Sequence, residues 1–170
     1  MGHERPIISV TLVGIGFALA VFFLIRLSSE AQASPPWWAD CSQALYVANE
    51  GNGGGGERIM RVDCNENIIT FATGFNGPSG LVTDGTYLYI SDDAPGLWRV
   101  DSAGVVTPIA TAVAFSNPNG LALDSSGRLL VADAGAGEIR RLTLDTAGNV
   151  TANELVASGL NNPQGGVVKP

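Results

Sequence analysis

The chain has 170 residues, which suits one domain, and it is acidic, with 9 Lys and Arg residues against 16 Asp and Glu residues. This charge argues against nucleic acids and anionic membrane surfaces as partners, because both attract basic proteins. His3 is the only histidine and Lys169 the only lysine. A Ser-His-Asp triad or any other histidine-based site is therefore excluded from the main part of the chain, and no catalytic residue is predicted.

Residues 1–33 are predicted to be a targeting segment. The uncharged run Ile7–Ile25 would, as a helix, nearly cross a hydrocarbon core of about 30 Å. Ala31-Gln32-Ala33 is a small-x-small pattern typical of signal-peptide cleavage. The length of the run favours a membrane anchor and the pattern favours a removed signal peptide, so both interpretations stay open. In either case we expect the chain after a linker at 34–42 to be exported to a periplasmic or extracellular space.

The two cysteines fit an oxidising compartment. Cys41 and Cys64 both follow the targeting segment, and such a pair most often forms a disulfide outside the cytoplasm. A metal site is disfavoured, because a tetrahedral site needs further His or Cys ligands. We therefore predict a Cys41–Cys64 disulfide, with two buried free thiols as the alternative.

From residue 43 onward the sequence repeats itself. The pattern Pro-x-Gly begins at Pro78, Pro118 and Pro163, which are 40 and 45 residues apart. Each unit holds short β-rich runs separated by Gly, Pro, Asn and Asp turns, as in the four-stranded blades of a β-propeller. We predict an all-β propeller preceded by one apolar N-terminal helix. The predicted blades are residues 43–76, 77–116 and 117–161, and a further blade starts at 162–170.

About three blades are present, whereas closed propellers have about four to eight. The first blade begins at its second strand, Leu45, and the sequence ends with the first strand of a further blade, Asn162–Val168. The chain is therefore expected to be a piece of a longer six-bladed protein or half of a homodimer. In the homodimer each copy would hand Asn162–Val168 to the first blade of its partner.

The glycine-rich stretch at 51–56 fits the G-x-G-x-x-G spacing of a dinucleotide-binding loop. Such a loop needs a following helix to supply N–H groups and a positive dipole. Here a predicted strand follows, so we interpret the stretch as an enlarged hairpin turn. A calcium loop that uses Glu50, Asn52 and Glu57 is the alternative.

The segment Pro-Asn-Gly-Leu-Ala-Leu-Asp at 118–124, followed by Leu-Leu-Val-Ala-Asp at 129–133, resembles an NHL-type repeat. It also resembles the senescence-marker/gluconolactonase family of six-bladed propellers, and the segment 155–165 is similar to a blade junction in that group. The resemblance covers about residues 43–168. It implies the blade fold but not one activity, because propeller blades carry many activities.

In the gluconolactonase family a divalent metal sits at the mouth of the central channel, and its ligands include an Asn that precedes Gly. The resemblance therefore makes Asn119 a candidate ligand for calcium, although Ser79 and Gln164 stand at the equivalent positions and neither is a carboxylate. Most aspartates recur at strand ends in every unit, which indicates turns that bind backbone N–H groups. Asp93 is the least repeated of them and is the second candidate ligand.

Two functions follow from these features. We favour an exported, non-catalytic module that recognises a ligand or a protein, or serves as a scaffold, and that needs no cofactor. The alternative is a calcium-dependent, lactone-hydrolysing enzyme that is intact only if further blades complete it. The sequence leaves enzymatic activity undecided.

Overall fold

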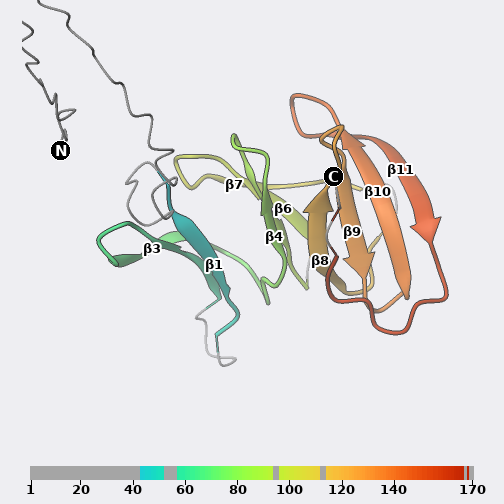
Figure 1. The fold of residues 1–170 in the computed structure, drawn as a ribbon, viewed down its shortest axis with the longest axis horizontal. Coiled ribbons are helices and arrows are strands. Elements are labelled where there is room, and N and C mark those ends of the chain that lie inside the picture. Colours follow the sequence, from blue (N-terminus) through green and yellow to red (C-terminus); the bar gives the residue numbers. More distant parts are fainter. Residues whose placement is uncertain (1–42, 52–56, 94–95, 112–113, 167, 169–170) are drawn as a thin grey trace, which may run out of the picture. The chain divides into compact units, whose positions relative to one another are not determined.

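The computed structural model of the chain describes residues 43–51, 57–93, 96–111, 114–166 and 168, all within the compact unit Pro36–Pro170. In this part of the chain the secondary structure is entirely β (Figure 1). The strands are β1 (Leu45–Asn49), β2 (Arg58–Val62), β3 (Ile68–Thr73), β4 (Leu81–Thr83), β5 (Leu88–Ser91), β6 (Leu97–Val100), β7 (Val106–Pro108), β8 (Pro118–Leu123), β9 (Leu129–Asp133), β10 (Glu138–Leu144) and β11 (Val150–Ala157).

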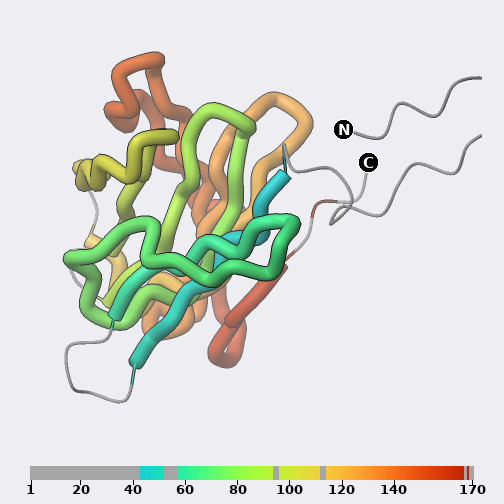
Figure 2. The backbone as a smooth tube through the Cα atoms, turned by 90° about the vertical axis from the view of Figure 1, so that its left-hand side faces the viewer, coloured from blue at the N-terminus to red at the C-terminus, as the bar shows by residue number. Residues whose placement is uncertain are grey.

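These strands form three antiparallel sheets, each a blade built in sequence order. Blade 1 is β1-β2-β3, blade 2 is β4-β5-β6-β7, and blade 3 is β8-β9-β10-β11. Figure 2 shows the hairpins of the blades behind one another along the chain. The predicted all-β propeller architecture is confirmed, and β1 at Leu45 is the first strand of the described residues.

Alternation along the second strand of each blade produces the core. In blade 2, Leu88 and Ile90 belong to the apolar cluster shared with blade 1, and Tyr89 belongs to the cluster shared with blade 3. Successive side chains of a strand point to opposite faces, so one strand serves two interfaces. This explains why these short runs are apolar throughout.

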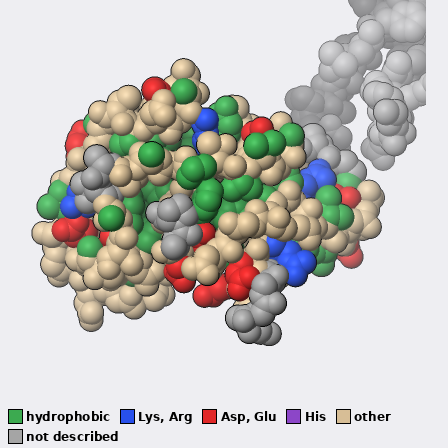
Figure 3. All heavy atoms as spheres, turned by 180° about the vertical axis from the view of Figure 1, so that it is seen from behind, with side chains coloured by type: hydrophobic (Ala, Val, Ile, Leu, Met, Phe, Trp, Pro, Cys, Tyr) green, Lys and Arg blue, Asp and Glu red, His purple; other side chains and the backbone are tan. Residues whose placement is uncertain are grey.

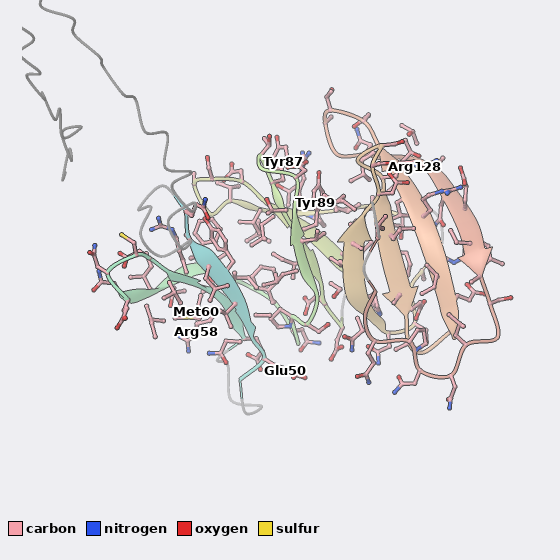
Figure 4. The ribbon with its side chains drawn as sticks, viewed as in Figure 1. Glu50, Arg58, Met60, Tyr87, Tyr89 and Arg128 are labelled. Carbon is pink, nitrogen blue, oxygen red and sulfur yellow. The ribbon has the colours of Figure 1, made fainter. Side chains whose placement is uncertain are left out.

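The two ends of the blades differ in their chemistry. At one end the hairpin turns are closed by aspartates that accept backbone N–H groups two to four residues ahead, as the recurring aspartates predict. The aspartates concerned are Asp63, Asp84, Asp101, Asp124 and Asp145. Tyr87 and Arg128 lie toward this end in Figure 4.

The opposite end, where β4 and β8 begin, is here named the P-x-G end. Glu50 and Arg58 lie toward it in Figure 4. Asn49 pairs with Arg58 across β1 and β2, so a strand follows the glycine-rich stretch, as predicted. Residues 52–56 lie outside the described residues, and so does Asn52 of the calcium-loop alternative.

One strand prediction is wrong. The segment Asn162–Val168 was expected to be a strand, but its described residues are not in a strand. A strand needs a ladder partner to satisfy its backbone groups, and the described residues offer this segment none. It runs beside β8 instead, where a Cβ added to Gly120 would lie 2.7 Å from the Gln164 carbonyl oxygen.

The targeting segment, the linker and Cys41 lie outside the described residues. Within the described ranges, no helix is long and apolar enough to cross a membrane. Cys64, in the turn after β2, is not a free cysteine. Because its expected partner is not described, the Cys41–Cys64 bond stays a prediction.

Candidate functional site

The Pro-x-Gly segments bring residues of successive blades together at the P-x-G end. A Cβ added to Gly80 would overlap the carbonyl oxygen of Asn119, and one added to Gly120 would crowd Gln164. Glycine is required at both places because the backbones of adjacent inner segments pass too closely for a side chain. Ser79, Asn119 and Gln164 are thereby placed in successive inner segments, and we call these three residues the neutral row.

Ser91 joins blades 2 and 3 beneath the neutral row. Its buried hydroxyl accepts the Gly80 N–H at 2.7 Å and donates to the carbonyl oxygen of Asn119. The Ser79 hydroxyl lies 3.2 Å from the Ser91 hydroxyl. Ala48 and Ala132 occupy the equivalent positions of the other blades. Sequence reasoning missed Ser91, although a lone hydroxyl at a position that is alanine in the other two blades was a usable signal.

Asp92 directly follows β5 and is fully buried. Its carboxylate accepts the backbone N–H of Asn76 at 2.9 and 3.0 Å and the indole N–H of Trp98 at 2.9 Å. Burial raises the pKa of Asp92, although the hydrogen bonds from Asn76 and Trp98 oppose the shift. This carboxylate holds the start of its own blade against the end of β5.

In blade 3, Asp133 accepts backbone N–H groups in the same way as Asp92 does in blade 2. It is 2% exposed and accepts the backbone N–H groups of Ser116, Asn117 and Ala136 at 2.8, 2.9 and 3.2 Å. In blade 1 an exposed Asn49 stands at this position and accepts the N–H of Gly51 at 3.2 Å. The buried carboxylates of the P-x-G end are therefore committed to the backbone.

The two predicted calcium ligands lie at this same end but in different surroundings. Asp93 is exposed and lies against Gly77, where an added Cβ would be 2.6 Å from its Oδ2 atom. Asn119 is half-buried, and its side-chain amide makes no hydrogen bond to another described residue. Figure 3, the view from behind, shows acidic side chains gathered along the lower edge of the molecule.

These residues do not fit calcium. A calcium site uses six to eight oxygen ligands, several of them charged. Ser91 engages the backbone carbonyl of Asn119 and the Ser79 hydroxyl, which leaves the uncharged side-chain amide of Asn119, and the carboxylates of Asp92 and Asp133 accept bonds from backbone donors. Among the described residues, no group of three or more His, Cys, Asp or Glu side chains could hold a metal ion.

Comparison with known proteins places the fold. The NHL-repeat family profile matches residues 115–142. Virginiamycin B lyase from Staphylococcus aureus is similar in structure, with a TM-score of 0.58 and 19% identity over 73% of this chain and 41% of that chain. A candidate gluconolactonase has a TM-score of 0.57 and 20% identity over 72% of this chain and 49% of that chain.

An auxiliary nutrient binding protein from Bacteroides thetaiotaomicron is similar too, with a TM-score of 0.57 and 17% identity over 71% of this chain and 30% of that chain. The chain thus spans less than half the length of these solved structures. No curated protein is significantly similar to it in sequence. At these identities the likeness is one of fold, since propellers support unrelated activities.

Proposed function

We propose that this chain, which carries an NHL repeat within β-propeller blades, is an exported, non-catalytic recognition or scaffold module. The observation that carries the proposal is the chemistry of the P-x-G end. Its buried carboxylates, Asp92 and Asp133, bind the chain's own backbone, and its inner rim presents the neutral row. Hydroxyl and amide groups suit hydrogen bonding to a ligand better than acid–base or metal chemistry.

Export is supported by sequence features alone. The uncharged run and the small-x-small pattern in residues 1–33 are typical of exported chains. Fusing residues 1–33 to a reporter enzyme that is active only outside the cytoplasm is expected to give activity. A fusion that lacks residues 7–25 is the control. Equal activity of the two fusions would contradict export through this segment.

A calcium-dependent, lactone-hydrolysing enzyme is the second candidate, favoured by the position of Asn119 in an inner segment. Binding of metal to the folded state alone would raise the melting temperature by mass action. We expect millimolar Ca²⁺ to leave the melting temperature of the full chain within about one degree, and we expect no lactone hydrolysis above background. These values follow from the uncharged oxygen ligands at the neutral row.

Two matched variants make this test specific. Asn119→Ala removes the candidate ligand, and Asn65→Ala makes the same change in the exposed Asp63 turn at the opposite end. If Ca²⁺ raised the melting temperature or supported hydrolysis, and Asn119→Ala alone abolished the effect, the enzyme would replace the recognition module as the proposed function. An effect that both variants retain would point to another calcium site and would leave the neutral row without a metal role.

A further inference from the structure

The face of blade 1 that points away from blade 2 exposes residues whose equivalents are buried inside the chain. Leu88 and Ile90 of β5 pack toward blade 1 and are 7% and 0% exposed. Leu45 and Val47 occupy the equivalent positions of β1 and are 45% and 39% exposed. Blade 1 therefore presents to solvent the surface with which blade 2 contacts its predecessor.

The outer face of blade 3 is the counterpart of that surface. It holds an apolar cavity of about 200 Å³ whose lining includes Leu130 of β9 and Ile139 of β10. The equivalent residues of blade 2 are Tyr89 and Leu97, which blade 3 covers almost completely. The cavity is thus the place where a following blade would pack.

The backbone edges match as well. Among the described residues blade 1 has no inner strand beside β1, whereas blades 2 and 3 have β4 and β8. Gln164 and Gly165 lie beside Gly120 of β8, in the place of the next inner segment, and Gly166 and Val168 line the cavity. Within the described residues, the segment after Pro163 is therefore an inner segment without a blade, and blade 1 is a blade without an inner segment.

We propose that a second copy of this chain supplies both missing parts. Blade 1 of each copy packs on the outer face of blade 3 of the other, and residues 162–168 add to the open edge of β1. Two such contacts about a two-fold axis close a ring of six blades, within the usual range of about four to eight. The register of β4 on β5 predicts that Gly166 lies opposite Val47 and Val168 opposite Leu45 of the other copy.

Continuity with the existing interfaces identifies the occupant. The contact between copies would repeat the contact that joins blade 2 to its neighbours, with apolar residues at the same positions of the repeat. The exposed apolar face of blade 1, the apolar cavity of blade 3 and an open strand edge are together a hazard that closure removes. The blades align with 41% and 49% of the length of two solved propeller-like structures, so two copies match most of either one.

The first test is the mass of the full chain in solution, measured by analytical ultracentrifugation. We expect twice the mass of one copy. Val47→Asp places a charge on the packing face and is expected to raise the dimer dissociation constant at least tenfold. Val105→Asp is the control, because Val105 is 58% exposed in a turn of the middle blade and should leave the dimer intact.

Gly165→Ala is a second, independent variant. In one copy an added Cβ at Gly165 meets nothing within 4 Å, so the three blades should keep their stability. In the ring the added Cβ would crowd the inner segment at Ser79 of the other copy, just as a Cβ added to Gly80 would crowd Asn119. We therefore expect weaker dimerisation with an unchanged circular dichroism spectrum.

Crosslinking gives an answer even in a heterogeneous preparation. Differently tagged copies with Leu45→Cys and with Val168→Cys are expected to form a disulfide-linked heterodimer, and Val105→Cys in place of Leu45→Cys is expected to form none. A folded monomer, or equal crosslinking of the two pairs, would overturn the proposal. A monomeric ring closed by further blades of a longer chain would overturn it too.

Discussion

Replacing Asp133 by Asn tests whether the buried carboxylates hold the blades together. The substitution keeps the shape of the side chain but exchanges one acceptor oxygen for an N–H₂ donor. Asp133 is 2% exposed and accepts three backbone N–H groups at 2.8, 2.9 and 3.2 Å. At least one of these donors would then face the amide nitrogen and lose its partner.

The expected loss of unfolding free energy follows from the number of hydrogen bonds that Asp133 accepts. A hydrogen bond to a charged group contributes about 1.5–3 kcal/mol, and a buried donor left without a partner costs about 1–3 kcal/mol. Since these terms overlap, we expect Asp133→Asn to lower the free energy of unfolding by about 2–4 kcal/mol. That is a large share of the roughly 5–15 kcal/mol available to a typical domain.

The assay is urea unfolding of the full chain at neutral pH, followed by circular dichroism. Asp93→Asn is the matched control, since Asp93 is exposed at the same end of the neighbouring blade. This control should stay within about 0.5 kcal/mol of the unsubstituted chain, as most exposed positions do. If Asp133→Asn changed the stability no more than Asp93→Asn, the structural role of the buried carboxylates would be refuted.

Three further predictions concern other parts of the blades. The urea midpoint should fall below about pH 4. Hydrogen bonds from the side chain and backbone of Asn149 lower the pKa of Asp145 in the folded state, and the stability that this gives is lost as the pH falls through that pKa. Asp145→Asn should make the midpoint depend less on pH, and an unchanged pH dependence contradicts the reasoning. Gly80→Ala should cost about 1–3 kcal/mol, because the new methyl group overlaps the next inner segment, and an unchanged melting temperature argues against that close approach. Intact-mass analysis of exported, non-reduced protein should find Cys41 and Cys64 protected from alkylation until reductant is added; two alkylated cysteines in the non-reduced protein would exclude the disulfide.

The blades could be predicted from the sequence because the residues that mark their turns and strands are local and recur in every unit. Each hairpin turn at one end contains its own aspartate, and the acceptor and donors are only two to four residues apart. The Pro-x-Gly spacing sets where inner strands begin, and β4 and β8 lie there. Repetition also identified the turn aspartates as structural, since a turn is needed in every blade and a catalytic group only once.

Long-range features were not predictable in the same way. Asn162–Val168 has the residues of an inner strand but is not one in its described part, because strand formation depends on a partner that local sequence does not reveal. Ser91 differs from the alanines at the equivalent positions of the other blades, but the sequence does not show what its hydroxyl contacts. Its hydroxyl acquires a role only because the Asn119 carbonyl of the next blade comes within reach.

The pair Asp92-Asp93 shows why adjacent identical residues need the structure to be told apart. Asp92 is buried and accepts hydrogen bonds from Asn76 and Trp98, whereas Asp93 is exposed beside Gly77. A carboxylate already bound to backbone donors is costly to redirect toward a ligand, because those donors would be left without partners. If the proposed recognition takes place at the P-x-G end, it must therefore use groups that the fold does not require, and the side-chain amides of Asn119 and Gln164 meet that condition. A ligand bound there would be held by hydrogen bonds from uncharged groups, and its affinity should depend little on ionic strength.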